Sequence, residues 1–132
     1  MPNANEIHGT VFKNASATFL ARVVNSEETP ITDADIASAK YSVYLVDEND
    51  MTAHTVVSAH SDVSVSVGSI IFGSLQNDDS WDVDNTGYNF KHSLDVLSDQ
   101  AFTEAGRIYR IVFELTPTYG QVIVVRFRVH VI

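Results

Sequence analysis

The sequence contains no cysteine, and this absence excludes several classes of protein. Disulfide scaffolds, zinc knuckles, iron–sulfur sites and thiol catalysis all require cysteine. A chain of 132 residues can bury roughly two thirds of its unfolded surface, so one hydrophobic core stabilises it without a disulfide or a metal. We therefore expect a single domain that needs no cofactor.

Basic residues and long apolar runs are also scarce. Eight Lys and Arg stand against seventeen Asp and Glu, a formal net charge of −9. This charge repels phosphate backbones and anionic lipids, so we expect neither nucleic acid nor a membrane as a partner. No window offers about eighteen uninterrupted apolar residues, and the start MPNANEIHGTVF has no basic segment before an apolar one. The sequence predicts a soluble protein without a classical signal peptide.

The sequence motifs of common enzymes are missing as well. There is no Gly-x-Ser-x-Gly, P-loop or dinucleotide fingerprint. The five histidines, at positions 8, 54, 60, 92 and 130, form no His-x-His or His-Glu-x-x-His pattern. Asp78 and Asp79 are adjacent in the chain, whereas the two carboxylates of a glycosidase face each other across a cleft. We expect no enzymatic activity.

Alternating apolar and polar residues predict β-strands along most of the chain. The clearest strands, residues 108–116 and 121–132, are joined by Pro117-Thr118-Tyr119-Gly120, a typical hairpin signal. Other strands are predicted at residues 17–24, 40–46, 55–59, 63–67, 69–72 and 88–94, with a short helical turn within residues 33–39. About seven or eight short antiparallel strands indicate an all-β fold, an immunoglobulin-like β-sandwich.

The first residues lack this alternation. We therefore divide the chain into an extended N-terminal arm, residues 1–14, and a sandwich, residues 15–132. Ile7, Val11 and Phe12 offer too little apolar surface to order the arm by themselves. The arm is expected to be mobile in the isolated protein and to become ordered on a neighbour, with Ile7 and Phe12 in the contact.

The acidic stretch NDDSWDVDNTGYNF permits a calcium-binding interpretation. Asp82, Asp84 and Thr86, followed by Gly87, reproduce the first half of a calcium loop, in which the glycine allows a sharp turn. The match then fails, because Ser93 stands where the loop needs a bidentate acid. The three residues are therefore only a weak candidate for a metal site, and no metal is expected.

The aromatic residues of the same stretch permit two further interpretations. Trp81 with Tyr88 and Phe90 would suit an aromatic platform for a sugar ring. The favoured interpretation is a structural corner, with a mostly buried Trp81 as its anchor and Gly87 in its turn. Tyr88 and Phe90 lie two residues apart and so share one face of a strand, while the polar Asn89 lies on the other.

Half of the basic residues lie on or beside the final hairpin. They are Arg107, Arg110, Arg126 and Arg128. Alternation places Arg110, Arg126 and Arg128 on one sheet face, while acidic residues gather around positions 47–50 and 78–84. Such a polarised surface suits contacts with copies of the chain or with an acidic partner. The alternative is a solvated face in which an arginine pairs with an acid, such as Glu114, on the neighbouring strand.

The second half of the chain resembles a known group of proteins. The run SIIFGSLQNDDSWDVDNTGYNFKHSL, followed after a short gap by GRIYRIVFELTPTYGQVIVVRFRVHV, is similar to small, mostly uncharacterised proteins encoded beside structural genes of tailed phages. The resemblance extends over residues 15–132. The matching positions are Ile71-Phe72, Leu75-Gln76, Trp81, Asp84, Gly87-Tyr88-Asn89-Phe90, His92, Tyr109 and the final hairpin. It implies a genomic setting and no residue-specific role.

These observations together predict a structural, non-enzymatic virion protein of a tailed bacteriophage. It would be made in the cytoplasm of the bacterial host and incorporated into the virion as a capsid cement or decoration protein, or as a neck or tail accessory. Its expected partners are other virion proteins and copies of itself. A carbohydrate-binding module and an adhesion-type sandwich are the alternatives.

Overall fold

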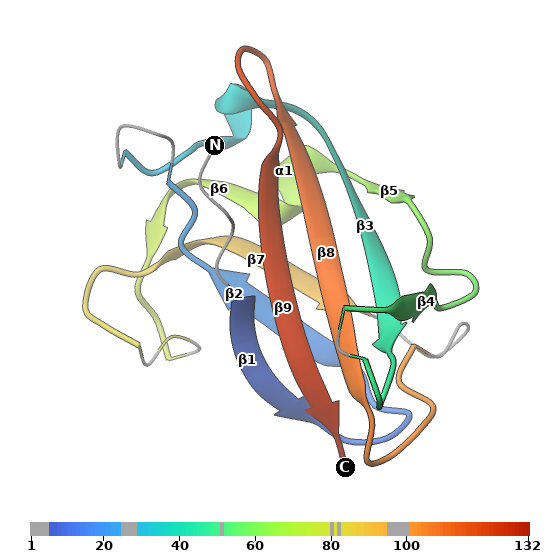
Figure 1. Ribbon diagram of the computed structural model, residues 1–132. Coiled ribbons are helices and arrows are strands. Elements are labelled where there is room, and N and C mark those ends of the chain that lie inside the picture. Colours follow the sequence, from blue (N-terminus) through green and yellow to red (C-terminus); the bar gives the residue numbers. More distant parts are fainter. Residues whose placement is uncertain (1–5, 25–28, 51, 80, 82, 95–100) are drawn as a thin grey trace.

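The computed structural model describes residues 6–24, 29–50, 52–79, 81, 83–94 and 101–132, which form two β-sheets packed face to face (Figure 1). The large sheet has the order β1-β9-β8-β3-β4, and β5 also pairs with β3. Its strands are β1 (Glu6–Val11), β3 (Ile36–Val46), β4 (His54–Val56), β5 (Val63–Val65), β8 (Ile108–Pro117) and β9 (Ile123–Val131). The predicted all-β class is therefore confirmed.

The small sheet has the order β2-β7-β6. Its strands are β2 (Ala17–Ala21), β6 (Ile71–Gln76) and β7 (Tyr88–Leu94). Two short helical pieces, η1 (Asp33–Asp35) and α1 (Val67–Ile70), precede β3 and β6. Within the described residues, no helix has the length and apolar character needed to cross a membrane.

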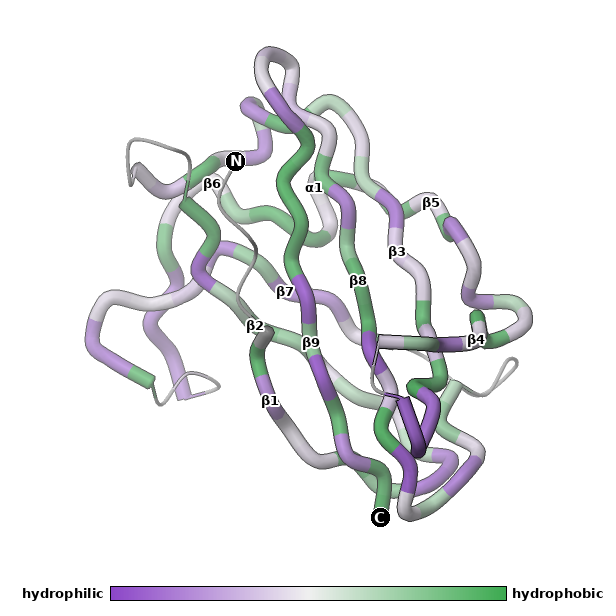
Figure 2. Tube along the Cα trace, in the orientation of Figure 1, coloured by the Kyte–Doolittle hydropathy of each residue, from purple (hydrophilic) through white to green (hydrophobic). Residues whose placement is uncertain are grey.

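The β8–β9 hairpin follows directly from its residue pattern. Figure 2 shows hydrophilic positions between hydrophobic ones in both strands, most regularly in the second half of β9. One set of side chains is buried, including Ile111 and Phe113 of β8 and Phe127 and Val129 of β9. Opposite residues pair Ile111 with Phe127 and Tyr109 with Val129, so the apolar sets share one face. This face becomes the wall of the core.

Aromatic rings fill the space between the two sheets. Phe19 of β2 and Phe90 of β7 come from the small sheet, and Phe113 and Phe127 from the large sheet. The ring centroids of Phe19 and Phe127, and those of Phe90 and Phe113, are 4.8 Å apart. These contacts between sheets supply the cohesion that a cysteine-free chain cannot obtain from a disulfide.

Residues 6–11 differ from the predicted mobile arm. They form β1, which pairs in parallel with β9, setting Ile7 against Phe127 and Val11 against Val131. The pattern was missed because Gly9 interrupts the apolar positions of a short strand, and because its partner lies more than a hundred residues away. The parallel β1–β9 pair is also an exception to the expected antiparallel arrangement.

Two smaller differences concern element boundaries. The helical turn predicted within residues 33–39 is limited to η1, and β3 already begins at Ile36. The strand predicted at residues 69–72 is instead the end of α1 followed by β6. Ile70 and Ile71 are both buried, so an apolar run alone does not separate a helical turn from a strand.

Candidate functional site

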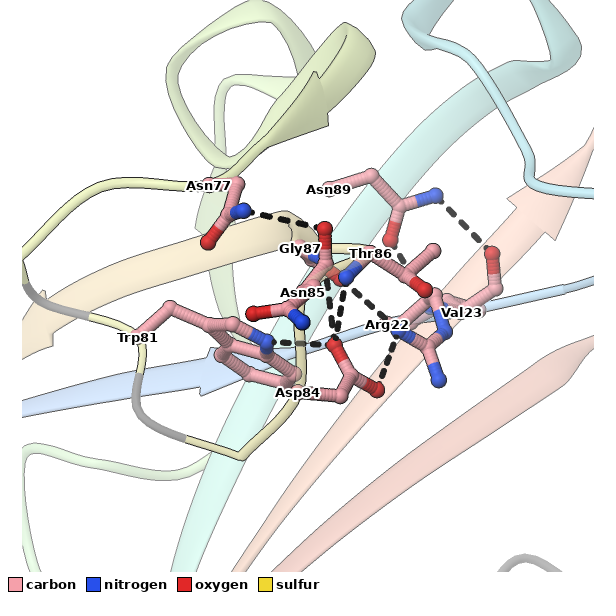
Figure 3. Close-up of polar contacts among 9 residues, drawn as sticks. All are labelled: Arg22, Val23, Asn77, Trp81, Asp84, Asn85, Thr86, Gly87 and Asn89. Carbon is pink, nitrogen blue, oxygen red and sulfur yellow. Dashed lines mark hydrogen bonds and ion pairs between the residues drawn. The ribbon is translucent and has the colours of Figure 1, made fainter.

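The loop between β6 and β7 is organised by the carboxylate of Asp84 (Figure 3). Its Oδ1 accepts hydrogen bonds from the Trp81 indole at 2.9 Å, the Thr86 amide at 2.9 Å and the Gly87 amide at 3.1 Å. Its Oδ2 lies 2.7 Å from Nη1 of Arg22. The Trp81 indole, then the Gly87 amide, Arg22 and the Thr86 amide hold the pKa of Asp84 well below its usual range. The ionised carboxylate therefore serves as the centre of a closed corner.

Gly87 is required by the backbone of this corner. Its φ is +105°, a region that side chains rarely adopt, and an added Cβ would collide with the carbonyl of Gln76. The side-chain amide of Asn77 donates to the Asn85 carbonyl at 2.9 Å and closes the loop from the other side. The corner is thus held at its turn by a glycine and at its base by side-chain hydrogen bonds.

The aromatic residues of the corner separate into two groups. Trp81 is half-buried rather than mostly buried, and its ring centroid is 5.7 Å from that of Tyr88. The Tyr88 hydroxyl donates to Asp78 at 2.8 Å, which raises the pKa of Tyr88. Phe90 belongs to the main core, 4.8 Å from Phe113. Trp81, Gly87 and Tyr88 therefore meet at the corner, while Phe90 anchors the strand that follows.

The structure bears on the weak calcium candidate in three ways. Asp82 lies outside the described residues. Both oxygens of Asp84 already contact protein donors, and Thr86 contributes a backbone amide to them. In the part of the chain that the structure describes, no three His, Asp or Glu residues gather as metal ligands. The donor set of this loop suits hydrogen bonding within the protein better than a cation.

Asn89 is a buried polar residue whose role the sequence did not reveal. Its side chain is 1% exposed. Oδ1 accepts from the Val23 amide at 2.7 Å, and Nδ2 donates to the carbonyls of Val23 and Ile31, both at 2.9 Å. The side chain thus substitutes for strand pairing between β7 and the segment that follows β2. A lone Asn between Tyr88 and Phe90 was the available signal, but alternation assigned it to a wetter face.

The outward face of the large sheet carries the three arginines predicted to share a face, and we call it the arginine face. Arg110 of β8 is directly opposite Arg128 of β9, and Val112 is opposite Arg126. All three arginines are half-buried. The fold therefore brings two arginines together on adjacent strands of this face.

Ion pairs border the arginine face on the side of β3. Lys40 Nζ lies 3.3 Å from Glu114 and 3.3 Å from Asp62. Hydrogen bonds first to Glu114 and then to Asp62 raise the pKa of Lys40. The predicted alternative paired Glu114 with an arginine, whereas the Glu114 carboxylate contacts this lysine. Arg107 lies apart, before β8, with its Nε 3.1 Å from Glu48.

Ile7 and Phe12, the other predicted contact residues, lie at the edge of the large sheet. Ile7 is on β1 and is 40% exposed, whereas Phe12 follows β1 and is 70% exposed. Ile7 is opposite Phe127, so its side chain is on the core side of the sheet rather than on the arginine face. The structure therefore divides the predicted contact residues between an edge and a face.

Two histidines pack against Tyr41 in the interior. His92 of β7 is opposite Phe19, which directs it between the sheets. Its ring is 5.2 Å from those of Tyr41 and Phe113, and its buried Nε2 has no partner among the described residues. Burial lowers the pKa of His92. His60 is also buried, with Nδ1 2.9 Å from the Tyr41 hydroxyl. These contacts hold rings in the core.

No protein-family model, curated protein or solved structure matches the chain. The similarity to proteins encoded near phage structural genes therefore stays a prediction. The functional argument rests on the fold and on the arginine face.

Proposed function

We propose that the two sheets are an immunoglobulin-like sandwich. The order β2-β7-β6 corresponds to strands B, E and D of that fold, and the order β3-β8-β9 to strands C, F and G. On this assignment β4 extends the second sheet at its C edge, and β1 is added at its G edge. Topology and not sequence similarity supports this assignment.

A tyrosine at the start of β8 is further support. In immunoglobulin-like domains a tyrosine near the start of strand F hydrogen-bonds to backbone a few residues upstream. Tyr109 lies near the start of β8, is 1% exposed, and accepts a hydrogen bond from the Glu104 amide at 3.2 Å. Two residues later, where antibody domains have a cysteine, Ile111 is fully buried. An apolar core residue thus stands where those domains have the cysteine.

We further propose that the protein is a structural, non-enzymatic component of a tailed-phage virion. It would act as a capsid cement or decoration protein, or as a neck or tail accessory, bound to other virion proteins and to copies of itself. The observation that carries this proposal is the arginine face, a concentration of basic side chains in a chain of net charge −9. The sequence resemblance to proteins encoded near phage structural genes supports the setting.

The arginine face suits a docking role. Arg110 and Arg128 bring two positive charges together, and an acidic surface placed over them would be attracted to both. The exposed acids Asp47 and Asp50 lie in the loop between β3 and β4. They offer such a surface on a second copy, and a repeated contact of this kind suits a symmetric assembly.

Purified particles of the phage that encodes the chain provide the test. Mass spectrometry should detect the protein in stoichiometric amounts, and its absence from intact virions would contradict the proposal. Particles that lack the protein should then recruit it when it is added back. We expect Arg110→Glu with Arg128→Glu to abolish recruitment. Lys13→Glu with Lys91→Glu, an equal change of charge away from this face, should leave it intact.

A carbohydrate-binding or adhesion-type role is the second candidate, because Trp81 is only half-buried and lies beside polar side chains. A glycan array with the wild-type protein and Trp81→Ala distinguishes the two roles. Glycan binding that disappears in a folded Trp81→Ala variant would favour the carbohydrate role. Binding to virions that is unchanged in the same variant would favour the structural role.

A further inference from the structure

A groove runs along one side of the sandwich, between β1 and β2. These two strands are consecutive in the chain, and each is the edge of its own sheet (Figure 1). The groove has a volume of about 160 Å³ and is lined by residues 7–11 and 17–20, with Phe127 and Val129. On the opposite side, α1 contacts both β3 and β7 and so links the two sheets. The groove therefore lies where the described strands leave the two sheets unconnected.

The backbone of β1 presents hydrogen-bonding groups to this groove. The Val11 carbonyl accepts from the Ile132 amide at 2.9 Å, and the Ile132 carbonyl accepts from the Lys13 amide at 2.9 Å. Successive residues of a strand direct their backbone groups to opposite sides. Gly9 therefore pairs with β9 as Val11 does, whereas His8 and Thr10 direct their amides and carbonyls to the outer edge.

This edge has little of the usual protection against added strands. Natural edge strands carry charged side chains, prolines or bulges that prevent pairing with another chain. Residues 6–11 contain one charged residue, Glu6, but neither proline nor lysine, and their register with β9 is uninterrupted. Partly exposed Ile7 and largely exposed Phe12 add apolar surface at the two ends. The edge is therefore a suitable template for an additional strand.

The two sides of the edge select different side chains. Toward the core, a Cβ on Gly9 would meet only a Val129 methyl at 4.0 Å, so small apolar side chains fit there. On the outward face, His8 is opposite Arg128, and Arg126 lies two residues earlier on the same face of β9. Because neighbouring strands are about 4.8 Å apart, outward side chains of an added strand would lie roughly 10 Å from β9, within reach of long arginine side chains.

We propose that this groove binds an extended segment of a partner protein as an added β-strand next to β1. Alternate side chains of the segment are small and apolar, and those between them are acidic and face Arg126 and Arg128. Strand addition is an established mode of peptide recognition, in which the backbone supplies affinity and alternate side chains supply specificity. This inference rests on the proposed docking role and describes the partner segment that the protein would bind. Its tests use the isolated protein.

Synthetic peptides test the chemistry of the segment. The probe is a capped peptide of alternating Val and Glu, seven residues long, compared with the Val and Lys peptide and with a Val and Glu peptide whose amides are N-methylated. We expect the first to bind at least about tenfold more tightly than the other two, since they lose the charge match or the backbone hydrogen bonds. Equal binding of the lysine peptide would overturn the acidic assignment, and equal binding of the N-methylated peptide would overturn strand addition.

Amide hydrogen exchange locates the added strand. On addition of the Val and Glu peptide, the His8 and Thr10 amides should become protected. The Gly9 and Val11 amides, which already bond to β9, should change little. Protection that appears elsewhere and not at His8 and Thr10 would rule out this edge as the binding site.

Three substitutions complete the test. Gly9→Val fills the groove, and Thr10→Pro removes an outward amide that the fold does not use, a change that edge strands tolerate. Both should lower peptide affinity about tenfold or more. Thr10→Val, an equally branched residue on the outward face, should not. If Gly9→Val does not fold, the peptide affinity of Thr10→Pro still tests whether the peptide binds at the edge of β1.

Sedimentation of the protein without peptide tests whether a second copy of the chain binds at the edge of β1. Dimers that Thr10→Pro dissociates would show that a second copy occupies the edge, and this would overturn the assignment to a partner segment. A protein that binds the peptide but is absent from virions would leave this inference standing while contradicting the virion role.

Discussion

At the scale of single residues, two polar side chains hold the small sheet to its surroundings. Asp84 connects the indole of Trp81, two backbone amides and Arg22 within one turn. Asn89 connects β7 to the backbone at Val23 and Ile31, outside the residues of β2 that pair with β7. Both residues have a structural role, because the polar atoms of each side chain are hydrogen-bonded or ion-paired to nearby groups. Substitution of either residue should therefore lower the free energy of unfolding.

Asp84→Asn should destabilise the protein in a way that depends on pH. The pKa of Asp84 is lowered in the folded state, so its contribution is present above the unfolded pKa of about 3.9 and is lost as the pH falls through the folded value. The melting temperatures of wild type and variant should differ at pH 7 and converge as the pH is lowered from about 5 to 2. Asp79→Asn, a substitution of an exposed neighbour, is the control. A difference in melting temperature between wild type and Asp84→Asn that stays constant with pH would show that the charge of the Asp84 carboxylate does not stabilise the fold.

Asn89→Ala should lower the free energy of unfolding by about 2 to 4 kcal/mol, because it leaves the Val23 amide and the Ile31 carbonyl without a partner inside the protein. Urea denaturation measures the loss. Asn85→Ala, at an exposed position in the preceding loop, should cost little. Equal stability of the two variants would show that water replaces the Asn89 hydrogen bonds.

At the scale of elements, β1 is the part of the fold that most changes the functional argument. As a free arm, residues 1–14 would have docked on a neighbour and left the isolated protein unaffected. As a strand, β1 is part of the large sheet and covers Phe127 and Val129 on its core side. What it offers a partner is its outer edge, so β1 contributes to stability and to recognition through different atoms.

Deletion of residues 1–10 should therefore destabilise the isolated protein. The loss removes the ladder with β9 and exposes its apolar side chains, and we expect the melting temperature to fall by about 10 °C. Differential scanning calorimetry measures this change. Thr10→Pro, which keeps the inward hydrogen bonds of β1, should change the melting temperature by much less. An unchanged melting temperature after the deletion would restore the mobile-arm interpretation.

At the scale of the whole molecule, the two sheets are held together by rings, and one of these rings titrates. His92 projects from β7 of the small sheet onto Tyr41 of β3 and Phe113 of β8 in the large sheet. Burial favours its neutral form. Protonation of His92 would therefore weaken the contact between the two sheets. His60, which is also buried, contacts Tyr41 at the same place.

His92→Phe should weaken the dependence of stability on pH. The folded pKa of His92 is lowered, so the unfolded chain takes up the proton first, and stability falls as the pH drops below about 6.5 until the folded protein also binds the proton. Melting temperatures between pH 8 and 5 should fall less steeply in the variant than in wild type. His130→Phe, at an exposed position of β9, is the control. Identical slopes would exclude His92 as the source.

Features that depend on neighbouring residues were determined by the sequence itself. Alternation over a few positions predicted the strand at residues 88–94, which the structure places at the same residues, and the final hairpin, whose strands differ from the prediction by one or two residues at their ends. The glycine in the turn before the strand at 88–94 is likewise a local signal, because Gly87 adopts a positive φ that other residues rarely adopt. Arg126 and Arg128 share a face because residues two apart in a strand point the same way.

Only the tertiary structure decided which distant residues meet. The parallel pairing of β1 with β9 and the position of Arg110 opposite Arg128 depend on register between separate strands. The same holds for the burial of Asn89 and the inward direction of His92, both of which lie on β7. Register is set by the fit of all apolar side chains into one shared core, and a shift by one residue would turn each side chain to the other face. No local pattern carries that information, because it arises only when the two sheets pack together.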